Sequence, residues 1–329
     1  MKVNFCGYKY RNLEGNWLKM YQYTAKAFDE LGFDLAVSPF LDWDCNYKKT
    51  IINSYDDIYV YNHTFLSELR KEDFWTGRKT LILKPTGPTD TTFTIDTEGY
   101  SAASSITYTK PEFENIDETD FFEKTVPYLI SSKANKWKGR QDLQFLNQSV
   151  DTPKNHILLI GQMPADETVT KMSFGYHWSK LAHIVKTLES YGKNLVIKIH
   201  PTLKTECKKE DWDWFFHEIK IWQQKHTVFY DFESLHEILP NTKVAIVENS
   251  TAGIECLIHQ VPIISFGYPE YHWVTKDLRH INKLINYIED LSWWSKSLAN
   301  KWLVWYCTKY QCYDYPSTLS RVKHLVEGI

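Results

Sequence analysis

The chain has 329 residues, which is enough for two domains of ordinary size. Hydrophobic residues make up 43% of the sequence and charged residues 24%, which is typical of a soluble globular protein. The formal net charge of -3 argues against a strongly electrostatic nucleic-acid binder, although it leaves room for a local basic groove.

The six cysteines are scattered without a CxxC pair, so we expect reduced thiols and neither a disulfide framework nor a zinc site. The first residues, MKVNFCGYKYR, lack the apolar core of a signal peptide. No stretch approaches the roughly 20 apolar residues that span a bilayer. We therefore expect a cytoplasmic protein without an integral membrane segment.

Short apolar strands alternate with helices in the first half of the chain. The patterns predict strands at 3–6, 34–38, 57–61 and 81–84, and helices at 16–31 and 121–130. This alternation predicts a doubly wound parallel sheet that binds ligands at the carboxyl ends of its strands. His63 follows one such end, where a structural role is commoner than a functional one.

The segment 93–105, FTIDTEGYSAASS, holds Asp96 and Glu98 among small residues. Carboxylates in such loops usually cap turns. A carboxylate fixed within hydrogen-bond reach of an incoming hydroxyl can also act as a general base. Both interpretations stay open on the residues alone.

The segment 133–140, KANKWKGR, places four cationic residues around Trp137. Such a cluster can bind a nucleic-acid backbone and stack a base, although a solvated helix end is commoner. The polar residues 144–155 have no apolar period and predict a domain boundary. We expect an N-terminal domain over 1–150 and a C-terminal domain over 151–329, whose last helices can pack back on the first domain.

The second half repeats the alternation. The patterns predict strands at 156–160, 194–199, 227–230, 244–247 and 261–266, and helices at 176–191, 211–224, 234–239, 254–259, 278–286, 290–308 and 316–327.

Two strand ends in this half carry residues suited to phosphate. Lys198 and His200 lie where the strand 194–199 ends, and Pro201 blocks its continuation. The alternative is a strand end with an exposed lysine and histidine.

After the strand 244–247, Ser250 and Thr251 supply hydroxyl and N–H groups to a helix start, where the macrodipole favours an anion. Glu255 lies about one turn into this helix, where it could reach a pair of sugar hydroxyls. An ordinary helix cap with a solvent-facing glutamate is the alternative.

Four segments resemble the motifs of one known family. They are Lys198-Ile199-His200-Pro201, the stretch Asn249–Gly267 with Tyr271 after it, the pair Gln162 and Asp166, and Thr97–Tyr100 with the small residues that follow. Together and in this order they are similar to the K-x-H-P, S-T-x-G-x-E-A-L, Q-x-x-x-D and E-D-G-F motifs of the capsule polysaccharide synthesis glycosyltransferases, which include Kdo transferases.

The sequence departs from these motifs at three places. Cys256 replaces the usual alanine, Gln260 replaces the glycine before Val261, and no basic residue stands at Ser101–Ala102. A Kdo-like donor carries a carboxylate, so the missing basic residue favours a neutral sugar.

The resemblance implies a GT-B glycosyltransferase, with two Rossmann-like α/β domains that face each other across a cleft. The C-terminal domain would hold a CMP- or UDP-linked sugar, and the N-terminal domain a glycan or lipid-linked acceptor. It implies no cofactor and no metal, which agrees with the lack of a DxD at a strand end, since Asp211-Trp212-Asp213 falls in a helical segment.

The resemblance also implies roles for individual residues. His200, Lys198 and the N–H groups at Ser250 and Thr251 would stabilise the leaving phosphate. Glu255 would fix sugar or ribose hydroxyls, Glu98 would be the general base, and Asp96 is the second candidate base. The implied donor-binding residues are Gln162, Asp166, Lys198, Pro201, Asn249, Ser250, Thr251, Gly253, Glu255 and Gly267.

Two alternatives remain. A phage-type DNA glycosyltransferase that modifies hydroxymethylated bases would use the 133–140 cluster, with the net charge of -3 against it. A sugar-nucleotide epimerase with two Rossmann-like domains, or an inactive binding module, is the other. The main hypothesis places a phosphate between the Lys198/His200 strand end and Ser250, facing Glu98.

Overall fold

The computed structural model describes residues 1–7, 16–39, 57–62, 77–136, 150–164, 166–173, 177–203, 209–229 and 233–327. The chain forms two compact units, one of residues 1–111, 134–140 and 304–329, the other of residues 112–133 and 141–303. The division thus differs from a single break at residue 150. The C-terminal residues belong to the first unit because a strand and a helix there pack on its sheet.

The first unit is built on a mixed sheet in the order β12-β5-β4-β3-β1-β2. Strands β2, β1, β3 and β4 are parallel, whereas β5 runs antiparallel to β4 and β12 antiparallel to β5. The strands are β1 (Lys2–Gly7), β2 (Asp34–Pro39), β3 (Ile58–Asn62), β4 (Lys79–Pro85), β5 (Phe93–Asp96) and β12 (Gln311–Cys312). Its helices are α1 (Asn16–Glu30), η4 (Ser101–Ala103), α3 (Ser105–Tyr108), the π-helical turn η9 (Tyr306–Tyr310) and α13 (Tyr315–Glu327).

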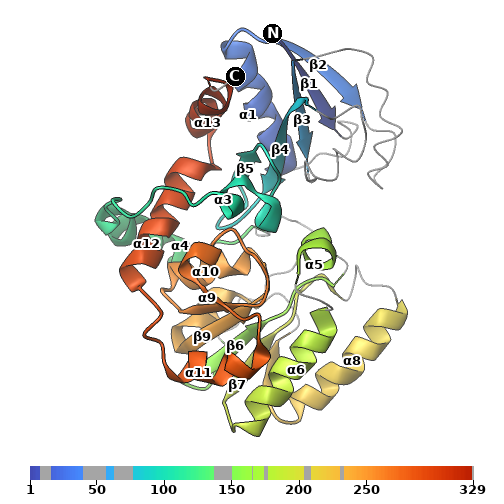
Figure 1. The fold of residues 1–329 in the computed structure, drawn as a ribbon, viewed down its shortest axis with the longest axis vertical. Helices are drawn as coiled ribbons and strands as arrows, with labels where there is room; N and C mark the ends of the chain where they lie inside the picture. Colours follow the sequence, from blue (N-terminus) through green and yellow to red (C-terminus); the bar gives the residue numbers. More distant parts are fainter. Residues whose placement is uncertain are drawn as a thin grey trace. The chain divides into compact units, whose positions relative to one another are not determined.

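Helix α1 covers part of this sheet with one apolar face. Met20, Thr24, Ala27 and Phe28 follow at intervals of four, three and one residues and are fully buried. Helix α13 lies beside α1 (Figure 1), and Val322 belongs to the same apolar core. The last helix therefore packs on the same apolar core as α1.

The second unit has a sheet in the order β11-β10-β9-β6-β7-β8, with every neighbouring pair parallel. Its strands are β6 (His156–Ile160), β7 (Leu195–Lys198), β8 (Thr227–Phe229), β9 (Thr242–Val247), β10 (Ile263–Ser265) and β11 (Lys276–Asp277). Its helices are the π-helical turn η5 (Phe121–Thr125), α4 (Val126–Ser131), α5 (Glu167–Met172), α6 (His177–Ser190), α8 (Lys209–Gln223), α9 (Leu235–Ile238), η6 (Leu239–Asn241), α10 (Ala252–Ile258), η7 (His272–Val274), η8 (Ile281–Lys283) and α11 (Leu284–Glu289). Helix α12 (Lys296–Trp305) leads from this unit into the first.

This strand order is that of a Rossmann-like domain. The first strand, β6, lies in the middle, with β7 and β8 on one side and β9 to β11 on the other. Every residue of β6 is buried, as expected for a parallel strand covered on both faces. Helices α6 and α8 lie next to each other (Figure 1) and are joined by Trp178 and Phe215, whose ring centroids are 3.9 Å apart.

The predicted elements are confirmed at most of the described positions. Asp211-Trp212-Asp213 lies within helix α8, as expected. The structure adds β5 where the sequence predicts a loop, and it adds the two-residue strands β11 and β12. In the described residues, no helix combines the length and apolar character needed to cross a bilayer.

Candidate functional site

The last residues of four strands in the second unit pair with one another across the sheet, and we call these four residues the registered row. Ile160 of β6 pairs with Lys198 of β7 and with Val247 of β9, and Val247 pairs in turn with Ser265 of β10. Two residues beyond this row stand four predicted donor-binding or catalytic residues: His200, Gln162, Asn249 and Gly267. The sheet register therefore brings the predicted residues of the second unit to a single edge. This edge includes the point between β6 and β9 where the strand order reverses, the usual ligand site of such sheets.

Three of the predicted residues converge on Thr168, in the first turn of α5. The Gln162 amide donates to the Thr168 hydroxyl at 2.9 Å, and the Asn249 amide donates to the Thr168 carbonyl at 2.8 Å. Asp166 caps the helix, accepting from the Thr168 N–H at 2.8 Å and from its hydroxyl at 2.6 Å. This network fixes the start of α5 above the ends of β6 and β9.

His200 lies two residues after the end of β7, and its contacts with Thr202 define its tautomer. Its Nδ1 lies 3.4 Å from the Thr202 N–H nitrogen and 3.0 Å from the Thr202 hydroxyl. Because a backbone N–H can only donate, Nδ1 acts as an acceptor and the proton of the neutral ring lies on Nε2. Nε2–H is thus suited to donate to an anionic oxygen. Pro201 occupies the turn between these two residues.

Lys198, the last residue of β7, is buried. Its ammonium nitrogen lies 3.2 Å from a carboxylate oxygen of Glu233 and donates to the carbonyl of Ile199 at 3.3 Å. Lys198, which the sequence predicts to bind phosphate, thus already has an anionic partner.

The turn before α10 uses part of its hydrogen-bonding capacity internally. The Ser250 hydroxyl accepts from the Ala252 N–H at 3.2 Å, its carbonyl accepts from the Gly253 N–H at 3.1 Å, and Ile254 N–H donates to Thr251. No acceptor within the described residues pairs with the N–H groups of Ser250 and Thr251. These two groups, and not the first N–H groups of the short helix, are therefore placed to meet an anion.

Gly253 and Gly267 allow close packing behind this turn. A Cβ atom on Gly253 would lie 2.0 Å from the ring of Tyr271, whose hydroxyl donates to the Ser250 carbonyl at 2.5 Å. Burial raises the pKa of Tyr271 well above 10.0, so the hydroxyl keeps its proton. A Cβ atom on Gly267 would lie 3.0 Å from the carbonyl oxygen of Glu248.

Glu248 is a fully buried carboxylate at the end of β9. The Ser173 hydroxyl donates to it. Burial lowers the pKa of Lys180, and the charge of Glu248 acts against this shift. Glu255, in contrast, is half-buried on α10, one turn after Thr251.

In the first unit, Asp96 is fully buried at the end of β5. One carboxylate oxygen accepts from the N–H groups of Glu98, Gly99 and Ser105 at 2.8, 3.0 and 2.9 Å. The other accepts from the Ser105 hydroxyl at 2.6 Å and from the Tyr310 hydroxyl at 2.7 Å. A carboxylate so fully occupied holds the loop 96–105 together and is poorly placed to take a proton from a substrate.

Glu98 is half-buried on the loop that Asp96 orders. The C-terminal segment supports the same loop, because Tyr310 bonds to Asp96 and Arg321 donates to the Ile95 carbonyl at 3.1 and 3.0 Å. Of the two predicted bases, Glu98 is therefore the better candidate. The expectation that Glu98 faces the bound donor phosphate stays a prediction.

The other predicted features contribute less. His63, Trp137, Lys138 and Arg140 lie outside the described residues. Lys133, the first cation of the 133–140 cluster, forms an ion pair with Glu237 at 2.8 Å.

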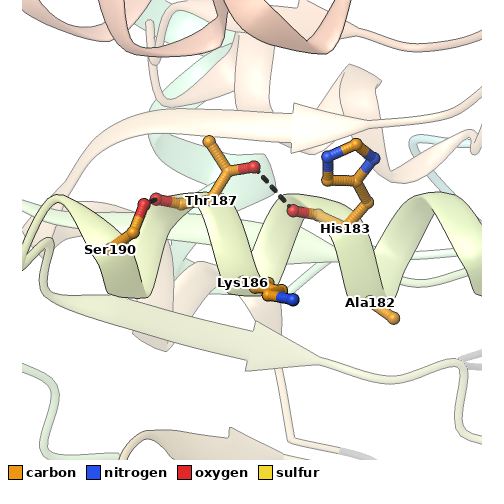
Figure 2. A pocket seen from close by; sticks show the side chains of 5 residues that line it. All are labelled: Ala182, His183, Lys186, Thr187 and Ser190. Carbon is orange, nitrogen blue, oxygen red and sulfur yellow. Dashed lines mark hydrogen bonds between the residues drawn. The ribbon is translucent and has the colours of Figure 1, made fainter.

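Figure 2 shows a pocket lined by Ala182, His183, Lys186, Thr187 and Ser190. All five residues belong to α6 at helical spacing, and the Thr187 hydroxyl bonds back to the His183 carbonyl at 2.8 Å. It is an open hollow along one helix and contains none of the predicted site residues.

The sequence interpretation missed three residues that shape the edge: Thr168, Glu233 and Glu248. Asp166-x-Thr168 was a readable signal, because an aspartate followed by a threonine is typical of a capped helix start. Glu233 and Glu248 gave no such signal, since their roles depend on partners 35 and 75 positions away at Lys198 and Ser173.

Comparisons with known proteins agree with this architecture. Two solved structures of KpsC from Thermosulfurimonas dismutans are similar to the chain. The beta Kdo 2,4 transferase aligns with a TM-score of 0.58 and 15% identity over 95% of this chain and 93% of that one. The beta Kdo 2,7 transferase aligns with a TM-score of 0.52 and 15% identity over 98% and 99%. This likeness shows the GT-B fold of two Rossmann-like domains.

A comparison with curated protein sequences finds no match. A family model described as "Capsule polysaccharide biosynthesis protein" matches residues 106–284, more than half of the chain. The match includes the residues at the ends of β6, β7, β9 and β10. The chain belongs to the capsule polysaccharide biosynthesis protein family.

Proposed function

We propose that the chain is a glycosyltransferase that moves a sugar from a nucleotide-sugar donor to a hydroxyl of a glycan or lipid-linked acceptor in capsule polysaccharide synthesis. The observation that carries the proposal is the registered row Lys198, Ile160, Val247 and Ser265, beyond which His200, Gln162, Asn249 and Gly267 follow. The family membership and the transferase activities named for the two similar structures support it.

The donor would bind along the carboxyl edge of the second sheet. Strands β7 and β9 flank β6, so their ends are two strand spacings apart, about 10 Å. The two phosphates of a nucleoside diphosphate match this separation better than a single phosphate does. We therefore propose that His200 and Lys198 bind one polar part of the donor and the N–H groups of Ser250 and Thr251 another, as a nucleoside diphosphate would allow. A CMP-linked sugar remains the second candidate donor.

In the proposed reaction, Glu98 takes the proton of the acceptor hydroxyl, and the hydroxyl oxygen forms a bond to the anomeric carbon of the donor sugar. The bond from that carbon to the phosphate oxygen breaks, and the nucleotide leaves with the electron pair. The charge that develops on this oxygen would be stabilised by His200, Lys198 and the two N–H groups. We propose that no metal takes part. Glu255 would bind ribose or sugar hydroxyls.

Replacing Glu98 by glutamine tests the assignment of the base. The substitution keeps the shape of the side chain but removes its ability to take a proton. We expect sugar transfer to fall by about 100-fold or more, while the affinity for the free nucleotide, measured by calorimetry, stays close to that of the wild type. Unchanged turnover would remove Glu98 from the mechanism.

Nucleotide release separates transferase from epimerase and from an inactive binding module. A transferase releases free nucleotide in step with an added acceptor, whereas an epimerase converts the donor without any acceptor. The family match does not favour modified DNA as the acceptor. A cytoplasmic location is part of the proposal and is supported by Cys6, Cys256, Cys307 and Cys312, which are free thiols.

A further inference from the structure

Lys198 and Glu233 form a buried ion pair at the edge where we place the donor. The Lys198 ammonium is 3.2 Å from a Glu233 carboxylate oxygen, and the two side chains are 6% and 16% exposed. Glu233 directly precedes Ser234, whose hydroxyl caps α9 by accepting from the His236 N–H at 3.3 Å. The carboxylate is thus held by a capped helix start beyond β8, the strand next to β7.

Burial makes this pair sensitive to a third charge. A buried ammonium is unfavourable without a nearby anion, and the Glu233 carboxylate supplies that anion for Lys198. A phosphate that reached the same ammonium would also satisfy it, but the phosphate and the Glu233 carboxylate would repel each other. The two anions therefore compete for one cation.

We propose that Glu233 is a positioning residue that takes the place of the donor phosphate beside Lys198 while the site is empty. It holds the ammonium at the end of β7, and it yields the ammonium to the phosphate when donor binds. This inference rests on the proposed function, in which Lys198 binds the donor.

Replacing Glu233 by glutamine separates this role from a purely structural one. The amide keeps the shape and an acceptor oxygen but removes the negative charge. Affinity for UDP, CMP and GDP is measured by calorimetry, and stability by urea unfolding. We expect the nucleotide that binds the wild type to bind about tenfold more tightly to Glu233→Gln, although this variant unfolds at a lower urea concentration. A structural residue would give weaker binding together with lower stability.

Glu237→Gln is the matched control, because Glu237 lies four residues further along and pairs with Lys133 at 2.8 Å. This substitution removes an ion pair of the same segment without changing the charge beside Lys198. We expect its nucleotide affinity to equal that of the wild type. A tenfold gain in this variant too would overturn the inference, since the effect would then be one of overall charge.

A second variant covers the case in which Glu233→Gln does not fold. The double variant Lys198→Met and Glu233→Gln removes both charges of the pair. It should bind nucleotide more tightly than Lys198→Met alone, because the repulsion between the phosphate and the Glu233 carboxylate does not depend on Lys198. Equal or weaker binding after loss of Glu233, in either background, overturns this inference and leaves the proposed function standing. If the wild type binds none of the three nucleotides, the proposed function fails and this inference with it.

Discussion

Asp96 shows how a residue that resembles a catalytic base can instead order its loop. Its two oxygens accept from Glu98, Gly99, Ser105 and Tyr310, which come from three separate segments of the first unit. Hydrogen bonds to a buried carboxylate contribute more to stability than bonds between neutral groups. The catalytic candidate Glu98 therefore depends on Asp96 for its position.

Replacing Asp96 by asparagine should lower the free energy of unfolding by about 2 kcal/mol, because one oxygen becomes an amide that cannot accept from Ser105 or Tyr310. Urea unfolding measures the loss. Tyr310→Phe removes a single donor and should cost about 1 kcal/mol. If Asp96→Asn kept full stability but lost all transfer activity, Asp96 would be a chemical participant and the structural interpretation would be wrong.

Gly253 is a residue at which even a methyl group does not fit. Its Cβ atom would lie 2.0 Å from the ring of Tyr271, which also packs edge-on against Trp302 with centroids 6.2 Å apart. Gly253→Ala should therefore cost about 1–3 kcal/mol in unfolding free energy, since Tyr271 must move and release Ser250.

Gly161 offers the control at the same edge of the sheet. Its Cβ atom would meet nothing closer than 3.6 Å, so Gly161→Ala should change the unfolding free energy by less than about 0.5 kcal/mol. Equal losses in the two variants would show that the close approach of Tyr271 does not explain the need for Gly253.

At the scale of elements, helices α9 and α10 are joined by a pair of histidines. His236 Nδ1 lies 2.8 Å from His259 Nε2, so one ring donates and the other accepts. Burial, together with the neighbouring His236, lowers the pKa of His259 from 6.5 to about 4. Between these two values the unfolded chain binds a proton that the folded chain does not, so stability falls as the pH falls.

We expect this histidine to remove about 2 kcal/mol of unfolding free energy between pH 7.5 and pH 5.0. Urea unfolding of the wild type and of His259→Gln at both pH values measures the effect. The variant should lose less stability on acidification, because it lacks the group with the lowered pKa. Identical pH dependence in both proteins would contradict the assignment to His259.

The sequence predicts most of these elements because their patterns are local. The apolar run of β6 and the periodic face of α1 need no knowledge of distant residues. Strand β5 is hidden by the small and acidic residues that follow it, and β12 has only two residues, so its pairing with β5 comes from a contact across more than 200 positions. Gln260 has a φ of +56°, which explains why the family motif has glycine at this position.

At the scale of the whole molecule, the two units differ in how much of the candidate site the sequence could predict. In the second unit, His200 and Asn249 are readable because each lies two residues after a strong parallel strand. In the first unit, the role of Asp96 depends on Tyr310, which is 214 positions away and carries no recognisable motif. Ion pairs such as Lys198–Glu233 could not be predicted from the sequence for the same reason.

The most direct test of the account is the unfolding temperature in the presence of CMP-, UDP- and GDP-linked sugars. A donor present at 100 times its dissociation constant stabilises a protein by about 2.7 kcal/mol, which corresponds to a rise of several degrees. We expect such a rise with one nucleotide class and its loss in His200→Ala. No rise with any class at millimolar concentration, or an undiminished rise in His200→Ala, would contradict a donor site at the carboxyl edge of the second sheet.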